Sequence, residues 1–505
     1  MKILPCLFIL SVFFSNAEAQ NKSFNIVDFG AKAGLQFSNS KAIQQTINVA
    51  AKAGGRVFFP SGQFVTGPIE MKSNVTLYLS EGAELLGSTN RLDYGKNDAK
   101  ALISAKAQHN IAITGKGTIN GRGAEVVKNL LLCLHQGLLE DETWRIKRPS
   151  ENNRPRLIAF SNCEDITVKN VTLKNSAGWV QDFVNCNRLN IDRVTVESTA
   201  YWNNDGIDIV NSKNVNITNC NIDAADDGIC LKSEGSPGIC ENVSVSNCTI
   251  RSSASGFKLG TGSYGGFKNI KVRNITVYNT YRSAIALEAV DGGFIDNVDI
   301  EGVTAKYTGN AIFIRLGHRN KTSQYSSIKN VRIAKVKADI PDAKPDAGYP
   351  LEGPLPKVPP HNLLPASITG IPGHLVEDIV LEDIEITYGG GASEKTANIP
   401  VDQLDNVVEN EAGYPEFTMF GELPAWGFYI RHAKGISFKN IKLNYKTTDF
   451  RPAVIFDDVT SINLDNLQVE KGENPHQVIL KKTEKVSIKN IKLPLNDKES
   501  VKVLQ

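Results

Sequence analysis

The 505-residue sequence has little net charge and no long hydrophobic run. Its 56 Lys and Arg residues exceed the 54 Asp and Glu residues by only two, which argues against nucleic acid as the main partner. No stretch reaches the roughly 18 uninterrupted apolar residues of a membrane-spanning helix, so we expect no membrane span. The eight cysteines lack the CxxC spacing typical of zinc sites. We therefore expect neither a metal nor a cofactor.

The first 19 residues have the features of a secretory signal peptide. Lys2 supplies the positive charge, Leu4 to Phe14 form the apolar core, and Ala17-Glu18-Ala19 is a small-x-small cleavage site. We predict that the mature chain begins at Gln20 and is exported to the periplasm or out of the cell.

The predicted mature chain contains seven cysteines, so at least one stays unpaired. We expect most of them to be small buried apolar residues. A disulfide between Cys230 and Cys240 is the alternative, which export permits without requiring.

One pattern recurs along most of the chain: apolar-x-apolar-x-x-apolar-x-apolar, often with Asn before the third apolar position. That third position falls at residues 171, 194, 220, 248, 275, 298, 331, 384, 441, 467 and 491. Most steps between copies are 23 to 28 residues, which matches one coil of a parallel β-helix. The period-2 pairs predict strands, and the two-residue gap predicts a bend between them.

We therefore predict an all-β fold, a single-stranded right-handed parallel β-helix that forms one catalytic domain over residues 20–505. Each coil must stack on its neighbours because it cannot bury its apolar face alone. Residues 40–53 are the best helix candidate, with a Ser or Asn cap, and would cover the open N-terminal end. Two long steps predict loop insertions at about 337–372 and 389–425, typically on the binding face. We expect a monomer.

The densest polar segments are Asn203-Asn204-Asp205-Gly206-Ile207-Asp208 and Asp226-Asp227-Gly228. Asp205 and Asp226 are 21 residues apart, slightly less than one coil, so all three carboxylates should be neighbours. Such crowding raises at least one pKa and leaves a protonated acid beside ionised bases. Glycoside hydrolysis needs that division. Turn residues and calcium ligands remain alternative interpretations of these aspartates.

These segments resemble motifs of glycoside hydrolase family 28, the polygalacturonase family. Residues 204–208 resemble its N-T-D-G-I-D motif, and Asp226-Asp227 its paired aspartates. Further similar segments are residues 28–31, 54–62, 156–158 and 175–179. The resemblance implies hydrolysis of a pectic, acidic polysaccharide by single displacement with inversion. It implies Asp226 as the general acid, and Asp205 and Asp227 as the residues that position and deprotonate water.

Two family motifs are missing. Ser255 stands where a Gly-His-Gly would place its histidine, and Ala286 and Glu288 replace the cations of an Arg-Ile-Lys. Because cations form strong, often bidentate bonds with carboxylates, these changes should alter the sugar accepted at the cleavage site. They favour rhamnogalacturonan or chain ends as targets over plain homogalacturonan.

Charged and aromatic residues near these motifs are candidates for contacting an acidic sugar, although surface solvation or packing would also explain each one. The candidates are Asn204, Lys232, Lys258, Arg282, Glu288, Arg315, His318, Arg431 and Trp202. Trp202 is preferred over Trp179, Tyr281 and Trp426 because it directly precedes the aspartate motif. Two alternative functions stay open: a polysaccharide lyase on the same scaffold, and a non-catalytic glycan-binding β-helix.

Overall fold

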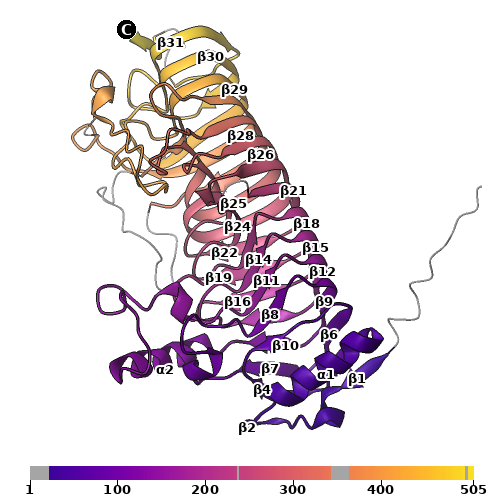
Figure 1. The fold of residues 1–505 in the computed structure, drawn as a ribbon. Helices are drawn as coiled ribbons and strands as arrows, with labels where there is room; N and C mark the ends of the chain where they lie inside the picture. Colours follow the sequence, from indigo (N-terminus) through magenta and orange to yellow (C-terminus); the bar gives the residue numbers. More distant parts are fainter. Residues whose placement is uncertain (1–21, 236–237, 343–362, 398, 495–498, 505) are drawn as a thin grey trace, which may run out of the picture.

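The computed structural model describes residues 22–235, 238–342, 363–397, 399–494 and 499–504. These residues form a parallel β-helix in which three rows of strands stack along one axis (Figure 1). The predicted fold is therefore confirmed. The predicted signal peptide lies outside the described residues and stays a prediction. Within them, the helices are all too short or too polar to cross a membrane.

In the N-terminal part of the solenoid each strand belongs to a single row, and successive strands along the chain fall in different rows. Row 1 holds β5 (Ile69–Glu70), β8 (Ile103–Lys106), β11 (Ile158–Ser161), β14 (Gln181–Val184), β17 (Ile207–Val210), β20 (Ile229–Ser233), β23 (Phe257–Ser263), β27 (Ala366–Thr369) and β32 (Val501–Leu504). Row 2 holds β1 (Ser23–Asn25), β3 (Gly55–Phe59), β6 (Val75–Leu79), β9 (His109–Gly115), β12 (Glu164–Lys169), β15 (Asn187–Asp192), β18 (Lys213–Thr218) and β21 (Ile239–Ser246). Row 3 holds β2 (Gly34–Ser38), β4 (Gly62–Thr66), β7 (Ala83–Gly87), β10 (Thr118–Asn120), β13 (Thr172–Lys174), β16 (Thr195–Ser198), β19 (Asn221–Ala224) and β22 (Thr249–Ser252).

Beyond residue 265 most strands continue through the bends and contribute to more than one row. They are β24 (Gly266–Ala289), β25 (Phe294–Leu316), β26 (Ser327–Asp339), β28 (Val376–Gly390), β29 (Phe428–Thr447), β30 (Val454–Val469) and β31 (Val478–Lys489). In β24 the chain pairs first with row 2, then with row 3, and finally with row 1.

The apolar repeat accounts for the register of the coils. Its first position forms one column of paired residues: 166, 189, 215, 243, 270, 298, 331, 379, 436, 462 and 486. The prediction that 298 and 331 are third positions is wrong, because Val303 and Val336 occupy the third position of those two coils. The Asn before the third position takes the left-handed conformation that Asn tolerates, with φ of 63° at Asn170 and 56° at Asn219. That conformation turns the chain between rows 2 and 3 and directs both apolar pairs inward.

All seven cysteines of the described residues are buried and unbridged. The Cys230 thiol contacts the Gly260 carbonyl at 3.0 Å, and the Cys240 thiol contacts the Ile209 carbonyl at 3.3 Å. The alternative of a Cys230–Cys240 disulfide is therefore wrong, and the expectation of buried apolar cysteines is confirmed.

Helix α1 (Ser40–Ala53) packs against β1, β3 and β5 at the N-terminal end of the solenoid (Figure 1). It buries Ile43 and Ile47, as a terminal cap requires. The predicted cap interaction is absent, because the Asn39 amide bonds to the carbonyls of Lys32, Phe37 and Val65 instead.

Helix α2 (Gly123–His135), which was not predicted, follows β10 and projects beside the coils (Figure 1). It interrupts the repeat between two coils and buries Val126, Leu130 and Leu134. Four short 3-10 turns also occur: η2 (Ile26–Phe29), η3 (Arg91–Tyr94), η4 (Glu151–Asn153) and η5 (Leu404–Asn406).

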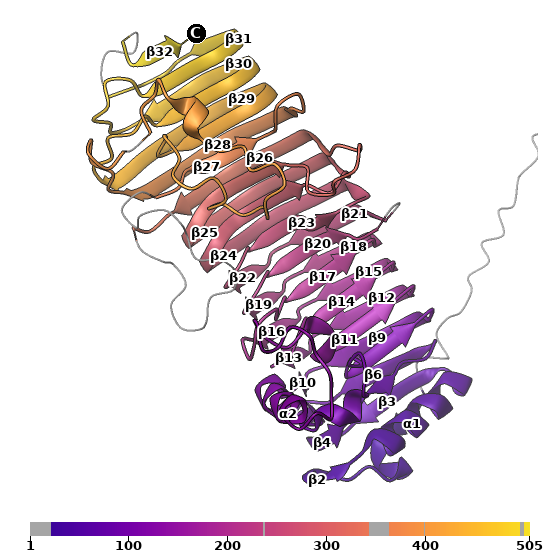
Figure 2. The same cartoon turned by 60° about the vertical axis from the view of Figure 1, so that its left-hand side comes forward.

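Two long connections coincide with the predicted insertions. Strand β26 ends at Asp339 and β27 begins at Ala366, and residues 343–362 between them lie outside the described residues. Strand β28 ends at Gly390 and β29 begins at Phe428. Residues 391–427, here called the β28–β29 insertion, lie against the C-terminal coils (Figure 2).

The β28–β29 insertion packs on the outer side of row 1 through a second apolar cluster. It contributes Leu404, Val407, Phe417, Phe420, Leu423 and Ala425. The coils contribute the outward residues Ala286, Phe313, Tyr429, Ile455 and Ile479. The C-terminal half of row 1 therefore carries one largely apolar column of outward residues, which the insertion covers.

Candidate active site

Tight contact between successive coils sets the position of Asp205. The Gly206 amide donates to the Asp227 carbonyl at 2.9 Å, which stacks Asp205 directly on Asp227. A Cβ on Gly206 would lie 2.6 Å from the Gly228 carbonyl oxygen, so only glycine fits after Asp205. One carboxylate oxygen each of Asp205, Asp226 and Asp227 lies within 4.8 Å of the others. The predicted proximity of the three aspartates is confirmed.

Asp226 is the most accessible of the three. It is half-buried, whereas Asp205 and Asp227 are each 4% exposed. The Asn203 amide donates to Asp226 Oδ2 at 3.2 Å, and the Asp227 backbone amide donates to Asp226 Oδ1 at 2.8 Å. Both contacts orient the carboxyl while leaving it reachable from outside.

Lys232 connects Asp205 to a fourth carboxylate. Its Nζ lies 2.9 Å from Asp205 Oδ2 and also bonds to Asp208, which faces outward from β17. The Trp179 ring centroid is 4.0 Å from the same ammonium. Lys232 therefore fixes one oxygen of Asp205, while the buried Oδ1 has no hydrogen-bond partner among the described residues.

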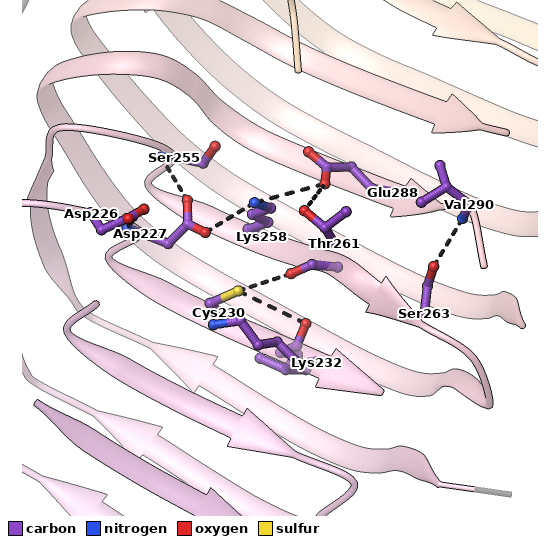
Figure 3. A network of polar contacts seen from close by, with 12 residues as sticks. Asp226, Asp227, Cys230, Lys232, Ser255, Lys258, Thr261, Ser263, Glu288 and Val290 are labelled. Atoms are coloured by element: carbon purple, nitrogen blue, oxygen red, sulfur yellow. Dashed lines mark hydrogen bonds and ion pairs between the residues drawn. The ribbon is translucent and has the colours of Figure 1, made fainter. Parts of the chain in front are cut away.

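Lys258 holds Asp227 in a similar way (Figure 3). Its Nζ lies 3.0 Å from Asp227 Oδ2 and 3.8 Å from Glu288 Oε2. The Thr261 hydroxyl donates to the same Glu288 oxygen at 3.3 Å. The Ser255 backbone amide donates to Asp227 Oδ1 at 3.0 Å, so both Asp227 oxygens are bonded.

This surrounding raises the pKa of Asp226 to about 7. Burial is the main cause, and the negative charges of Asp205 and Asp227 add to it. A carboxyl with this pKa is substantially protonated near neutral pH, as a general acid must be.

Asp227 differs from Asp226 because cations surround it. Burial opposes its ionisation, but Lys258, Arg282 and Lys232 together lower its pKa below the usual value. Burial raises the pKa of Asp205, and the Lys232 ammonium opposes that rise. The cluster thus combines a protonated acid with an ionised base, the division that general acid–base catalysis uses.

The β28–β29 insertion reaches this cluster. The Tyr414 ring centroid lies 5.7 Å from Lys258 Nζ and 5.6 Å from the Arg282 guanidinium, and the ring is 47% exposed. Burial lowers the pKa of Arg282, but the nearby Tyr414, Asp226, Asp227 and the buried Glu416 outweigh it and raise this pKa. The predicted site residue Arg282 is therefore placed beside the aspartates, under the insertion.

Asn204 and Trp202, which were predicted to contact the sugar, instead contact other parts of the protein. Asn204 is fully buried, and its side chain bonds to the Gly178 carbonyl at 3.0 Å and to the Ser198 hydroxyl at 2.9 Å. It supports the loop of Asp205 and cannot reach a sugar. The Trp202 ring stacks under the Arg148 guanidinium at 4.7 Å, whereas Trp179 is the aromatic residue in contact with Lys232.

Arg315 and Arg431 fasten the β28–β29 insertion. Arg315 is 1% exposed and donates to the carbonyls of Gly370 and Glu409 at 3.0 and 2.7 Å. Arg431 donates to the Val407 carbonyl at 2.8 Å and pairs with the Glu409 carboxylate at 2.7 Å. Both predictions of a sugar contact are therefore corrected to a structural role.

His318 lies in a stack of three rings. Its ring is 4.0 Å from the Tyr325 ring, which is 3.6 Å from the His374 ring. The His318 backbone amide donates to the Glu411 carbonyl at 2.8 Å. None of the contacts described for His318 involves an aspartate of the cluster.

Asn203, Asp208, Tyr414 and Glu416 were not predicted as site residues, and Trp179 was ranked below Trp202. Asp208 was visible as the last residue of the aspartate motif, and its outward direction follows from the alternation of β17. Tyr414 and Glu416 carry no local signal, because the path of a long insertion is set by packing at a distance.

The three aspartates fit a calcium ion poorly. They offer three clustered oxygens, whereas calcium takes six to eight. The ammonium groups of Lys232 and Lys258 already neutralise Asp205 and Asp227, and these positive charges would repel a cation. The residues present therefore support acid–base chemistry better than metal binding.

Comparison with known proteins adds a family match. Residues 51–340 match the sequence profile described as glycosyl hydrolases family 28. A probable polygalacturonase of Vitis vinifera is 27% identical over 323 residues, 58% of this chain and 62% of that protein. An exo-poly-alpha-D-galacturonosidase of Dickeya chrysanthemi is 27% identical over 252 residues, 41% of each chain. The chain thus spans about three fifths and two fifths of the lengths of these relatives.

A solved structure with the same fold is a hyperthermoactive exopolygalacturonase from Thermotoga maritima. It superposes with a TM-score of 0.57 at 23% identity, covering 73% of this chain and 87% of that chain. At this identity the likeness shows the fold alone.

Proposed function

We propose, from the premise that this chain belongs to glycosyl hydrolases family 28, that it is a glycoside hydrolase acting on pectic, galacturonate-containing polysaccharide. The observation that carries the proposal is the split between neighbouring carboxyls. Asp226 has a pKa of about 7, whereas the pKa of Asp227 lies below its ordinary value. Glycosidic cleavage needs an acid and a base at one bond.

In the proposed mechanism Asp226 protonates the glycosidic oxygen of the leaving sugar. Asp205 and Asp227 orient a water molecule and accept its proton as it attacks the anomeric carbon, with inversion in a single displacement. Lys232 and Lys258 act as positioning residues, because they hold one oxygen of each base carboxylate. The proposal needs no metal or cofactor.

The β28–β29 insertion covers the C-terminal half of row 1, which supports cleavage at the ends of the polysaccharide chain. Outward residues near the aspartates are polar, such as Asp182, Asp208 and Lys258. From Ala286 toward the C-terminus one outward column is largely apolar and lies under the β28–β29 insertion, and the polar column beside it holds Arg315 and Arg431, which bond to the insertion. A polymer bound along row 1 would meet this cover directly beyond the aspartates, so we propose that one end of the site is closed.

We further propose that residues 1–19 direct export to the periplasm or beyond and that residues 20–505 act as one monomeric catalytic domain. Polymeric pectin is found outside the cell, so export would bring the site to its substrate. Mass spectrometry of the exported protein tests this by showing whether the chain begins at Gln20.

A substrate panel tests the function. The mature protein is incubated with polygalacturonate, rhamnogalacturonan and a neutral glucan, and new reducing ends are measured. We expect release from a pectic polymer, lost by at least about 100-fold in Asp226→Asn and kept in the surface control Asp296→Asn. No release from either pectic polymer would refute the proposal.

The same experiment separates the two alternatives. A lyase would give unsaturated products that absorb in the ultraviolet, and it needs a neutral basic side chain. The pKa values of Lys232 and Lys258 are raised well above normal by nearby carboxylates that outweigh burial, so neither is a good base. A non-catalytic glycan-binding protein would bind pectin equally well with and without Asp226→Asn and release no sugar from it.

A further inference from the structure

Three cations line the candidate site, and each faces carboxylates of the protein itself. Lys232 pairs with Asp205 and Asp208, and Lys258 pairs with Asp227 and Glu288. Burial lowers the pKa of Arg282, but Tyr414, Asp226, Asp227 and Glu416 lie close enough to outweigh it and raise this pKa. All three cations are nearly or fully buried.

The balance of charge at this site is not positive. The acids in contact with these cations, or close enough to shift their pKa, are Asp205, Asp208, Asp226, Asp227, Glu288 and Glu416. Six acids therefore stand against three cations. Burial raises the pKa of Asp208, Asp226 and Glu288, that of Glu288 to about 7. Burial raises the pKa of Asp205 and Glu416 as well, so the excess of negative charge is present in full only at alkaline pH.

A carboxylate on the bound sugar would have to compete with a protein carboxylate for one of these cations. Breaking a buried ion pair leaves an uncompensated charge, which is costly. Bringing a further carboxylate beside Asp227 and Glu288 adds repulsion. A sugar hydroxyl avoids both penalties, since it can donate to or accept from a carboxyl without adding charge.

Glu288 occupies its place because of the register of the sheet. Lys258 pairs with Ala286 of the next coil, so Glu288 stands two residues further along the same outer face. Its side chain is 2% exposed and is held by Thr261 and Lys258 (Figure 3). Lys258 is therefore oriented by two carboxylates, one of them belonging to a proposed catalytic base.

We propose that the sugar beside Asp226 and next to the cleaved bond, on the side of the buried Lys258 and Glu288, is a neutral sugar recognised through its hydroxyl groups. The inference rests on the proposed function and names the substrate class of that site.

A pair of polymers that differ only in charge tests this. Polygalacturonate and its carboxyl-reduced form share linkage and stereochemistry and differ only in the charged group. Rates of reducing-end release are measured for both polymers and for rhamnogalacturonan, which alternates acidic and neutral residues. We expect kcat/KM for the reduced polymer to exceed that for polygalacturonate by at least about ten-fold, because repulsion between near charges is strong in a buried site.

The variant Glu288→Gln tests whether Glu288 causes the preference for the reduced polymer. In Glu288→Gln the preference for the reduced polymer should fall several-fold, because one repelling charge is gone. Glu301→Gln removes the charge of a half-buried acid of row 2 that pairs with Arg332 and Lys335, so it changes the net charge equally and should keep the preference. Binding of both polymers to Asp226→Asn, measured by calorimetry, gives the same comparison without turnover.

The outcomes are distinguishable. Faster cleavage of polygalacturonate than of its reduced form overturns the neutral-sugar inference and leaves the proposed hydrolase standing. Equal effects of Glu288→Gln and Glu301→Gln on the preference also overturn it. No release of reducing ends from any of the three polymers refutes the proposed hydrolase, and the inference falls with it.

Discussion

Lys258 Nζ lies 3.0 Å from Asp227 Oδ2. Lys258 is on the outer face of β23, which stacks on β20, the strand that follows Asp227 in the chain. The ammonium and the Ser255 amide bond to the two oxygens of Asp227. Asp227 therefore stays ionised although it is almost completely buried. A histidine at position 255, which the family motif would supply, is not needed to keep this carboxylate charged.

Replacing that ammonium should shift the pH dependence of activity. In Lys258→Met the pKa of Asp227 should rise, because a buried carboxylate loses its main cation. The acid limb of the kcat/KM profile should then move to higher pH, with a loss of about ten-fold or more at the low-pH end. Lys116→Met, an exposed lysine far along the chain, is the control. An unchanged acid limb in Lys258→Met would show that Asp227 is not the base.

The pKa of Asp226, about 7, predicts the other limb. As the pH rises through about 7, this carboxyl loses the proton that it must donate, so kcat/KM should fall. Aryl glycosides with good leaving groups need less protonation and should show a weaker fall. Steady-state rates between pH 4 and 9 on both kinds of substrate check this. A basic limb that is equally steep for both would remove Asp226 from the role of general acid.

The stereochemical outcome is a third prediction. The closest oxygens of the three aspartates lie within 4.8 Å, tighter than the roughly 6.5–9.5 Å between carboxyl groups of many inverting enzymes. We nevertheless expect inversion, because Asp205 and Asp227 stand side by side in the stack and can bind one water molecule between them and the sugar. Proton NMR of the first product distinguishes the anomers, and a retained configuration would require one aspartate to be a nucleophile.

The fold was predictable because it depends on a local rule repeated in every coil. Each copy of the repeat, from Ile166 to Val486, falls into one column, since inward apolar pairs and a left-handed bend fix the register of every coil. Helix α2 escaped prediction because it interrupts this repeat once and buries its apolar side only locally.

The aspartate cluster was predictable for the same reason, because one coil of separation stacks Asp205 on Asp227. The roles of the distant cations were not. Arg315 and Arg431 have the same types of sequence neighbour as Lys232, yet they bond to backbone carbonyls of the β28–β29 insertion. Which outward residues the insertion covers is decided by apolar packing between Phe417, Phe420 and distant coils, which no local pattern records.

His432 gives a fourth prediction, about the attachment of the β28–β29 insertion. Its Nδ1 lies 2.6 Å from Asp458 Oδ2, and its Nε2 lies 3.1 Å from Glu409 Oε1 in the insertion. Burial lowers the pKa of His432, but the bonds to Glu409 and Asp458 outweigh it and raise the pKa overall. The protonated ring therefore links the insertion to the coils.

Because this pKa is raised on folding, the stabilisation is fully present below about 6.5, the ordinary histidine value, and is lost as the pH rises through the folded-state pKa. His432→Gln should destabilise the protein by on the order of 1.5 kcal/mol at pH 5.5 and by much less at pH 9. Thermal unfolding at both pH values measures this. A protease should cleave residues 391–427 faster in His432→Gln than in the parent protein, at pH 5.5 only. The control His109→Gln, which changes an exposed histidine of β9, should be cleaved at the same rate as the parent protein. Equal destabilisation by His432→Gln at both pH values would show that the ring acts through packing and not through its charge.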